Sequence, residues 1–384
     1  MKTKTGTLWA FFKSVILTLP MMFLTLLMLT RGSLPSDPAQ GIALLGTFLF
    51  LNTIFFLMVF TGKTDRYRAV LFVAYSVAFV ISFTSHLIDV RGSMAISQAN
   101  RIEGDVPFCH IAIPMTILPA ALTKTIIFPG TIVGSYASVA SMFVLWIGMS
   151  LALGRGFCSW FCFFGGIEEG FSRVLKKPIL RNITTRWTYL PYAVLLVVVL
   201  LAAATLSPTY CAWLCPFKAV TEFAAITSFK TLVQTAIFVS LFLGLVVILP
   251  ILTKKRTQCT LLCPLGALQS ITNKANPFQV RVKAEACKGC MTCTRVCPTL
   301  SINRESIAKG GTRTSCTKCG KCVDACPEKA LFYHVKGTCL SNRIGRYRLL
   351  FIYPAFLVLA IMSGRYLEGA IAKAVTLIMG LGVR

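Results

Sequence analysis

Long apolar blocks separated by short polar segments dominate the chain up to residue 258. Each block is close to the ~20 residues that a helix needs to cross the hydrocarbon core of a bilayer, so the pattern predicts a polytopic helical membrane protein. The six blocks are residues 8–30, 42–60, 70–90, 135–153, 187–206 and 231–252. The first follows the basic start MKTKTG without a small-residue cleavage site, which favours a retained helix over a signal peptide.

Two later parts of the chain depart from this pattern. Residues 105–134 are largely apolar but are interrupted by four prolines. Because lipid does not tolerate broken backbone, we expect this segment to be re-entrant or to lie at the membrane interface. Residues 259–340 are polar, basic and rich in cysteine, as in a soluble module, and two shorter apolar blocks, residues 347–363 and 367–383, follow.

The basic charge of the chain fits a membrane protein better than a nucleic-acid-binding one. The formal net charge is +26, from 39 Lys and Arg against 13 Asp and Glu. Much of it stands at the ends of apolar blocks, for example at Lys63, Lys176 and Lys254, which is the positive-inside pattern and an anchor to anionic lipid. We therefore expect a multi-pass protein of a prokaryotic cytoplasmic membrane, in contact with lipid and not with nucleic acid, with the soluble module on the cytoplasmic side.

Eight of the 16 cysteines form two copies of the spacing C-x-x-C-x-x-C-x-x-x-C-P. Bacterial ferredoxins bind two [4Fe–4S] clusters with this run, and the fourth cysteine of each copy ligates the other cluster. The alternative, two structural zinc sites, would not need the proline-terminated crossover. The predicted ligands are Cys287, Cys290, Cys293 and Cys326 for the first cluster and Cys316, Cys319, Cys322 and Cys297 for the second.

The predicted fold is therefore mainly α. It is a membrane bundle of seven or eight helices with a small α+β ferredoxin-like domain inserted before the last helices. We divide the chain into a transmembrane domain (1–258), the ferredoxin-like domain (259–340) and carboxy-terminal transmembrane segments (341–384).

Three further cysteine pairs share the spacing C-x-x-x-C, and each begins where an apolar block ends. Cysteines four apart share a helix face, where a disulfide is geometrically unfavourable but a shared metal centre is possible. Since one helix separates each pair from the next, we expect the first and third pairs on one side of the membrane and the middle pair on the other. We predict a third cluster at the cytoplasmic membrane edge, held by Cys158, Cys162, Cys259 and Cys263; the alternative is cysteines packed as small hydrophobes.

The middle pair, Cys211 and Cys215, then needs partners on the far face. Cys109 is expected there and is followed by His110. A fourth cluster held by Cys109, Cys211 and Cys215, completed by His110 or another non-cysteine group, is one interpretation, and Rieske centres show that histidine can ligate such iron. The other is that Cys109 is a packed thiol and His110 an interfacial histidine. Cys339 has no partner in the sequence.

Both motif types, in this order, resemble the NapH/NosR-like membrane-bound polyferredoxins over roughly residues 135–335. The resemblance implies [4Fe–4S] electron exchange with the quinone pool or with a membrane or periplasmic partner. It also implies redox partner subunits such as a flavoprotein, a cytochrome or a soluble ferredoxin. The chain departs from the family pattern at Phe163, which replaces the proline expected after Cys162, and in its additional middle pair.

The leading interpretation of function is an electron-transfer subunit of an oxidoreductase complex. No nucleotide-binding glycine fingerprint, hydrolase elbow or P-loop is present in the sequence. The alternative is a maturation or regulatory factor that delivers electrons to metal-centre assembly in a partner enzyme. Ion-coupled energy conversion is disfavoured because acidic residues are scarce in the apolar blocks; Glu168, Glu169 and Glu222 stand at helix ends, where we expect them to face water.

Overall fold

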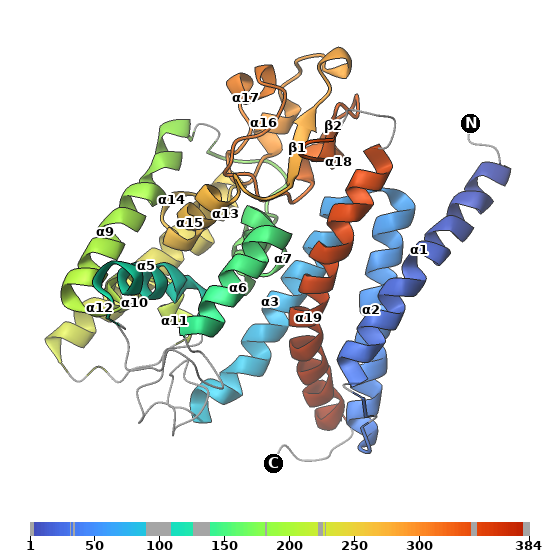
Figure 1. The fold of residues 1–384 in the computed structure, drawn as a ribbon. Coiled ribbons are helices and arrows are strands. Elements are labelled where there is room, and N and C mark those ends of the chain that lie inside the picture. Colours follow the sequence, from blue (N-terminus) through green and yellow to red (C-terminus); the bar gives the residue numbers. More distant parts are fainter. Residues whose placement is uncertain are drawn as a thin grey trace.

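The computed structural model describes residues 4–30, 32–33, 35–89, 109–125, 139–180, 183–221, 226, 228–338 and 344–378. Over these residues the chain is mainly helical, with one two-stranded sheet in the cysteine-rich module (Figure 1). The mainly α fold with a small α+β module is thus confirmed. Cys339 and Glu222 lie outside the described residues.

Four long helices form a bundle at one side of the molecule (Figure 1). They are α1 (Lys4–Thr30), α2 (Pro38–Thr61), α3 (Thr64–Asp89) and α19 (Ile344–Ile378). The Asp37 carboxylate accepts hydrogen bonds from the first backbone N–H groups of α2, and Gly62, at φ +76°, ends that helix in the left-handed conformation. Because α19 packs against α1, α2 and α3, helices from the two ends of the chain build this bundle together.

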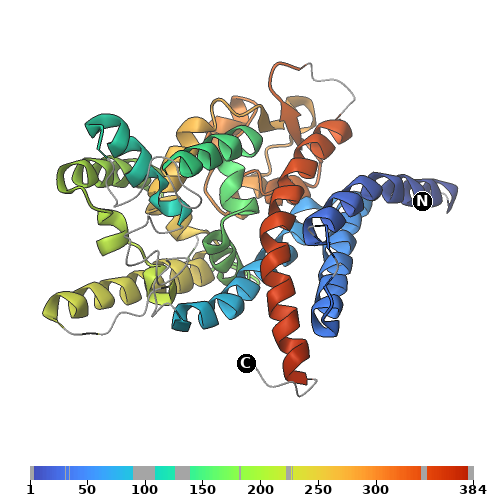
Figure 2. The same cartoon turned by 60° about the horizontal axis from the view of Figure 1, so that its bottom comes forward.

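A second group of shorter and bent helices carries the C-x-x-x-C pairs. Its elements are α6 (Val139–Ala152), η2 (Gly154–Gly156), α7 (Phe157–Trp160), α8 (Phe163–Phe171), η3 (Thr185–Tyr189), α9 (Leu190–Thr205), α10 (Thr209–Trp213), α11 (Lys218–Thr221), α12 (Phe229–Leu241), the π-helical η4 (Phe242–Ile248), α13 (Leu249–Thr253), α14 (Thr257–Leu261) and α15 (Pro264–Thr272). The chain bends by 108° between α6 and the turn formed by η2 and α7. This group lies beside the long-helix bundle in both views (Figures 1 and 2).

Within the described residues, fewer helices are long and apolar enough to cross a membrane than the seven or eight expected of the whole chain. In the described ranges, five helices are long and apolar enough to cross a membrane, or six if the bent pair of α6 and α7 counts as one. Residues 347–363 and 367–378, which belong to the last two apolar blocks, are not in separate helices, because both stretches lie in the 35-residue α19. Gly364 stands between them, and a single glycine without a proline is tolerated inside a helix.

Residues 109–125 form a short helical segment inside the protein. It comprises η1 (His110–Ala112) and α5 (Ile113–Thr123), and it packs against α6, α9 and α15. The 11 residues of α5 extend about 16 Å, well short of the ~30 Å hydrocarbon core. This part of the chain therefore does not cross the membrane by itself, as expected of a re-entrant or interfacial segment.

The ferredoxin-like module sits at one end of the helices (Figure 1). Strands β1 (Phe278–Val282) and β2 (Leu331–Val335) pair antiparallel, with Phe278 opposite Val335, so the start and the end of the module are hydrogen-bonded together. Between them lie η5 (Ala284–Ala286), α16 (Thr292–Val296), α17 (Arg304–Ala308) and α18 (Lys321–Ala325). α15 packs against α9 and η2 of the helical part, and the strands of the module begin at Phe278.

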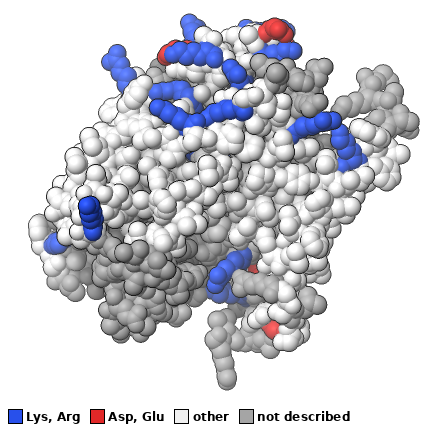
Figure 3. All heavy atoms as spheres, in the orientation of Figure 1, with Lys and Arg blue, Asp and Glu red and all other residues white. Residues whose placement is uncertain are grey.

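The surface separates charged and apolar regions. On the face in Figure 3, many Lys and Arg side chains gather over the module, above a broad surface with few charges. Large apolar side chains are exposed on the helices, among them Phe23, Val144 and Leu196. A soluble protein rarely exposes so wide an apolar surface, whereas a bilayer covers it.

Candidate metal centres

Four cysteines of the module line one cavity. Cys297, Cys316, Cys319 and Cys322 are among the residues that line this small cavity. Three of them belong to the second ferredoxin motif, and Cys297 is the last cysteine of the first. The fold therefore brings together the four residues assigned to the second cluster.

The other four module cysteines are placed nearer the surface. Cys293 lies within electrostatic range of Cys287 and of Cys326, the last cysteine of the second motif. Cys290 is exposed, and Arg295 donates a hydrogen bond to its carbonyl oxygen at 3.1 Å. A cluster held by these cysteines would be the more accessible of the two to a partner in solution.

The two crossing cysteines share one local backbone conformation. In each case the backbone N–H four residues further along donates to the sulfur, at 3.3 Å for Cys297 and 3.4 Å for Cys326. Leu300 and Lys329, three residues after each cysteine, have φ values of +51° and +50°, a conformation that non-glycine residues rarely adopt. Such N–H···S bonds orient a thiolate ligand and tune the potential of the cluster that it holds.

The donor set fits an iron–sulfur cofactor. None of the 15 cysteines in the described part of the chain is assigned to a disulfide. Burial raises the pKa of Cys319 and of Cys263 to about 12, so these thiols ionise at neutral pH only when a cation binds them. Sulfurs that bind one zinc ion lie within about 4 Å of each other. Among the described residues, no three His, Cys, Asp or Glu side chains are grouped closely enough for a single metal ion.

The first and third C-x-x-x-C pairs have the same local structure. Cys162 precedes α8 with φ −69° and ψ 107°, and Cys263 precedes α15 with φ −71° and ψ 115°. The short helices before them, α7 and α14, carry Cys158 and Cys259. Nη2 of Arg256 lies 2.5 Å from the carbonyl oxygen of Cys158 and 3.2 Å from Sγ of Cys259. The four residues assigned to the third cluster thus lie in one site.

Motif reasoning missed the buried charges around this site. Arg155 and Arg256 are buried, and each stands three residues before the first cysteine of its pair. In the middle pair that position is Pro208. This difference between otherwise matched motifs is the sequence signal by which the two arginines could have been found.

Glu168 and Glu169, which were expected to face water, are fully buried. Glu168 accepts hydrogen bonds from the backbone N–H groups of Gln258 at 2.6 Å and of Cys259 at 3.2 Å. Burial raises the pKa of Glu168 to about 7, although nearby positive charge and these hydrogen bonds oppose the rise. Burial acts in the same direction on Glu169, but Arg68 and two further arginines hold its pKa below the ordinary value. The expectation was wrong because α8 packs against α3 and α14 in the interior.

The middle cysteine pair lies close to the third pair in the structure. The hydroxyl of Tyr210 in α10 accepts a hydrogen bond from Nε2 of Gln258 in α14 at 2.8 Å. The Cys215 thiol lies within electrostatic range of Cys109 and Cys263. The expected separation by the thickness of the membrane is therefore not observed. The short helices α10 and α11 turn the chain back into the protein, where irregular backbone is tolerated.

Cys109 and His110 are directed at different pairs. Cys109 lies near Cys215, but Nε2 of His110 is 2.9 Å from Sγ of Cys162. The backbone of Cys109 is extended, at φ −130° and ψ 119°, and neighbouring side chains in extended backbone point in opposite directions. The assignment of His110 to the middle pair is thus corrected: its imidazole borders the first pair, packed against Phe157.

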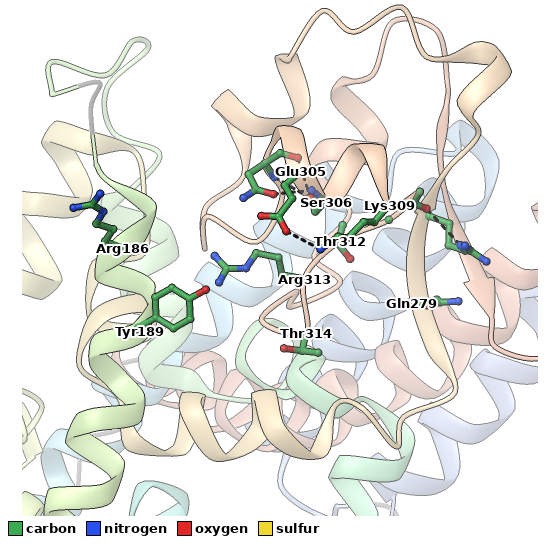
Figure 4. Close-up of a pocket in the computed structure, with 13 residues that line it drawn as sticks. Arg186, Tyr189, Gln279, Glu305, Ser306, Lys309, Thr312, Arg313 and Thr314 are labelled. Atoms are coloured by element: carbon green, nitrogen blue, oxygen red, sulfur yellow. Dashed lines mark hydrogen bonds and ion pairs between the residues drawn. The ribbon is translucent and has the colours of Figure 1, made fainter.

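A basic cleft of about 470 Å³ lies between η3 and the module (Figure 4). Arg186 and Tyr189 line it from η3, and Arg313 and Lys309 line it from the module. The Arg313 guanidinium lies 5.2 Å from the centre of the Tyr189 ring, and Lys309 pairs with Glu305 at 2.7 Å. Its net positive lining complements an acidic surface on a partner.

Comparison with known families identifies both cysteine-rich parts of the chain. A family described as "4Fe-4S dicluster domain" matches residues 279–327. One described as "4Fe-4S binding domain" matches three consecutive stretches, residues 137–182, 187–232 and 235–283, and each stretch holds one C-x-x-x-C pair. Multiple [4Fe–4S] clusters are therefore the cofactors of this chain.

Named relatives match about half of the chain or somewhat more. YccM of Escherichia coli is 29% identical over 239 residues, or 60% of this chain and 63% of YccM. The ferredoxin-type protein NapH of E. coli is 27% identical over 185 residues, 47% of this chain and 61% of NapH. The regulatory protein NosR of Pseudomonas aeruginosa is 28% identical over 215 residues, 52% of this chain and 27% of NosR. The matched region spans less than two thirds of each of these three relatives.

No solved structure matches the chain. The family matches and the apolar helices together show a membrane protein that binds several [4Fe–4S] clusters.

Proposed function

Because this chain belongs to the NapH/NosR-like family of membrane-bound polyferredoxins, we propose that it is an electron-transfer subunit of a membrane oxidoreductase complex. It connects a cytoplasmic donor or acceptor with the quinone pool or with a partner reached from the opposite face of the membrane. Two clusters are held by the module and a third by the first and third C-x-x-x-C pairs. Cys109, Cys211 and Cys215 hold a fourth, together with one further group.

The observation that carries this proposal is the direct docking of the module on the third cysteine pair. The backbone N–H of Arg256, which precedes α14, donates to the carbonyl oxygen of Pro298 at 2.8 Å. Lys255 donates from Nζ to the carbonyl oxygen of Cys297, also at 2.8 Å. From the first pair, Trp160 donates from Nε1 to the carbonyl oxygen of Lys318 at 3.3 Å. These contacts support a continuous path from module to membrane.

The outer part of the module supports a soluble partner at one end of this path. Cys290 is exposed, and the basic cleft between η3 and the module offers Arg186 and Arg313 at its rim (Figure 4). Complementary charge accelerates encounter with an acidic redox protein. Because iron–sulfur assembly needs reduced thiols, we assign the module to the cytoplasmic side.

An apolar cavity supports a lipid-soluble partner at the membrane end. It measures about 700 Å³ and lies between residues 179–180 and 183–190 on one side and the segment from η4 to α14 on the other. Leu261 and Leu262, which stand between Cys259 and Cys263 in the chain, line it. A π-helical turn such as η4 often marks a functional site. We assign quinone to this region because it combines an apolar lining with a neighbouring redox centre.

The test is electron flow across the full chain in proteoliposomes. The protein is purified without air, reconstituted in liposomes containing a quinone, and reduced from one face by a membrane-impermeant reductant. We expect electron paramagnetic resonance (EPR) signals of the module clusters to appear only when the reductant reaches the module face, and added quinone to reoxidise them. An iron content of only about eight per chain would remove both membrane clusters and with them the proposed route.

A second candidate function is a maturation or regulatory factor that supplies electrons to metal-centre assembly. The name of one relative, the regulatory protein NosR, favours it. Deletion of the chain in its host separates the two functions. Loss of metal from a partner enzyme that is still synthesised supports assembly, whereas a fully metallated partner that lacks only its electron supply supports direct electron transfer.

A further inference from the structure

Two buried arginines cross between the first and third cysteine pairs. Arg256, three residues before Cys259, donates from Nη2 to the carbonyl oxygen of Cys158 at 2.5 Å. Arg155, three residues before Cys158, donates from Nη2 to the carbonyl oxygen of Cys259 at 3.2 Å. Each arginine thus holds the first cysteine of the other pair. This reciprocal contact ties the two halves of the site together.

A glycine makes room for each of these arginines. Gly165 lies against Arg256, and a β-carbon at this position would overlap the guanidinium nitrogen Nη2. Gly266 lies against Arg155, and a β-carbon there would be 3.6 Å from Nη2 and 3.0 Å from the carbonyl oxygen of Cys259. Each glycine therefore leaves the space that the guanidinium group from the other pair's arginine occupies.

The first and third pairs consequently share the longer pattern R-x-x-C-x-x-x-C-x-x-G. The middle pair has Pro208 in place of the arginine and Lys218 in place of the glycine. Two chemically different kinds of site thus arise from one repeated motif. The crossing arginines distinguish the site at the edge of the module from the middle one.

The position of Arg256 bears directly on reduction. Its Nη2 lies 3.2 Å from Sγ of Cys259, and its side chain is fully buried. Four thiolates carry more negative charge than an oxidised [4Fe–4S] core neutralises, and reduction adds one more electron. A buried guanidinium beside a ligand sulfur stabilises the reduced form more than the oxidised form. Glu168 and Glu169, at 3.9 Å and 3.8 Å from Arg256, hold the arginine in place and offset part of its charge.

We propose that Arg155 and Arg256 are positioning residues that raise the reduction potential of the cluster held by the first and third pairs above that of the cluster on the middle pair. This inference rests on the proposed function, because it presupposes a cluster at each of these sites. It makes the arginine-bearing site the stronger electron acceptor of the two. Electrons arriving from the middle site therefore move towards the module edge.

The test is a redox titration of the purified full chain, followed by EPR. Arg256→Gln and Arg155→Gln are each expected to shift the equilibrium between the reduced and oxidised forms of one cluster at least tenfold towards the oxidised form. This shift corresponds to a reduction potential lower by about 59 mV for one electron. Arg256→Lys keeps the charge but loses the planar fork, so its shift is smaller. The matched control is Arg173→Gln, because Arg173 pairs with Asp65 and Glu169 in the same network. This substitution should leave the reduction potential of that cluster unchanged.

A second variant displaces the guanidinium without removing its charge. Gly165→Ala pushes Nη2 of Arg256 away from the site and is expected to shift the same signal in the same direction. Its control is Gly148→Ala in α6, where a β-carbon meets no atom within 4 Å. If Arg256→Gln fails to assemble, Gly165→Ala and Arg155→Gln decide the question.

The outcomes separate this inference from the proposed function. Full iron content with an unmoved potential in both glutamine variants overturns the role of the arginines. A missing cluster is recognised differently, since Cys158→Ser would then change neither the iron content nor any EPR signal. A selective shift in the arginine variants, together with loss of that signal in Cys158→Ser, supports both.

Discussion

The carboxylate of Asp324 accepts a hydrogen bond from the backbone N–H of Asp65 at 2.6 Å, across 259 positions of sequence. Its other oxygen accepts from the N–H of Thr64 at 3.1 Å. Thr64 and Asp65 open α3, so these N–H groups have no acceptor inside the helix. A residue of the ferredoxin-like module thus caps a helix of the membrane domain, and the cap fixes how the two parts meet.

Replacing Asp324 by alanine should weaken this docking. The change removes the acceptor from two backbone donors at the start of α3, and we expect the free energy of unfolding to fall by about 1 kcal/mol. Chemical denaturation of the purified protein, followed by the loss of cluster absorbance, measures the effect. Glu305→Ala removes a carboxylate from an exposed pair with Lys309 and should change stability by less than about 0.5 kcal/mol. Equal effects of the two substitutions would argue against the cap.

The crossover in the module predicts which cluster each cysteine serves. Cys297→Ser should perturb the EPR signal that Cys316→Ser perturbs, because both residues line the same cavity. It should spare the signal that Cys290→Ser perturbs. Iron analysis should show a loss of about four irons in each variant. A shared effect of Cys297→Ser and Cys290→Ser would mean that each motif holds its own cluster.

His110 and Cys109 should differ in their effect on iron content. The imidazole of His110 lies 2.9 Å from Sγ of Cys162, a distance suited to a hydrogen bond to a ligand sulfur. His110→Gln can still donate to that sulfur, and we expect it to retain all of the iron. Cys109→Ser should lose about four irons, since Cys109 is proposed as a ligand. Loss of iron in His110→Gln would instead make the histidine a ligand itself.

Gly166 marks a close contact between α8 and α3. A β-carbon at this position would overlap Oγ of Ser76 and lie 2.7 Å from the carbonyl oxygen of Phe72. Gly166→Ala should therefore destabilise the protein by about 1–3 kcal/mol, as measured by thermal unfolding in detergent. Gly148→Ala in α6, where there is open space, should leave stability unchanged or raise it by up to about 1 kcal/mol. A neutral Gly166→Ala would mean that α8 can move away from α3.

Much of the fold could be predicted from local patterns. Apolar blocks of bilayer length predict membrane helices, because unpaired backbone groups are not tolerated in lipid. The prediction of two separate carboxy-terminal helices was wrong, because the length of an apolar block does not show whether it continues into the next one. As far as Ile378, residues of the last two apolar blocks lie in one helix, α19, because helix formation continues across the short stretch between them, which lacks proline.

The candidate metal centres also differ in how far the local sequence predicts them. The spacing around Cys287 and Cys316 predicts two clusters because a short loop of fixed length wraps a cubane locally. The surroundings of the C-x-x-x-C pairs depend instead on distant segments. His110 meets Cys162, and Gln258 meets Tyr210, through turns whose direction the local sequence does not encode.

By itself, the sequence determined the membrane helices, the ferredoxin-like module and the identity of the thiols available to iron. Only the tertiary structure decided that Arg155 and Arg256 cross between two cysteine pairs and that Glu168 and Glu169 are buried beside them. The reason is physical. Hydropathy and ligand spacing are short-range properties of the chain, whereas burial of a charge depends on which remote groups pack around it and satisfy it.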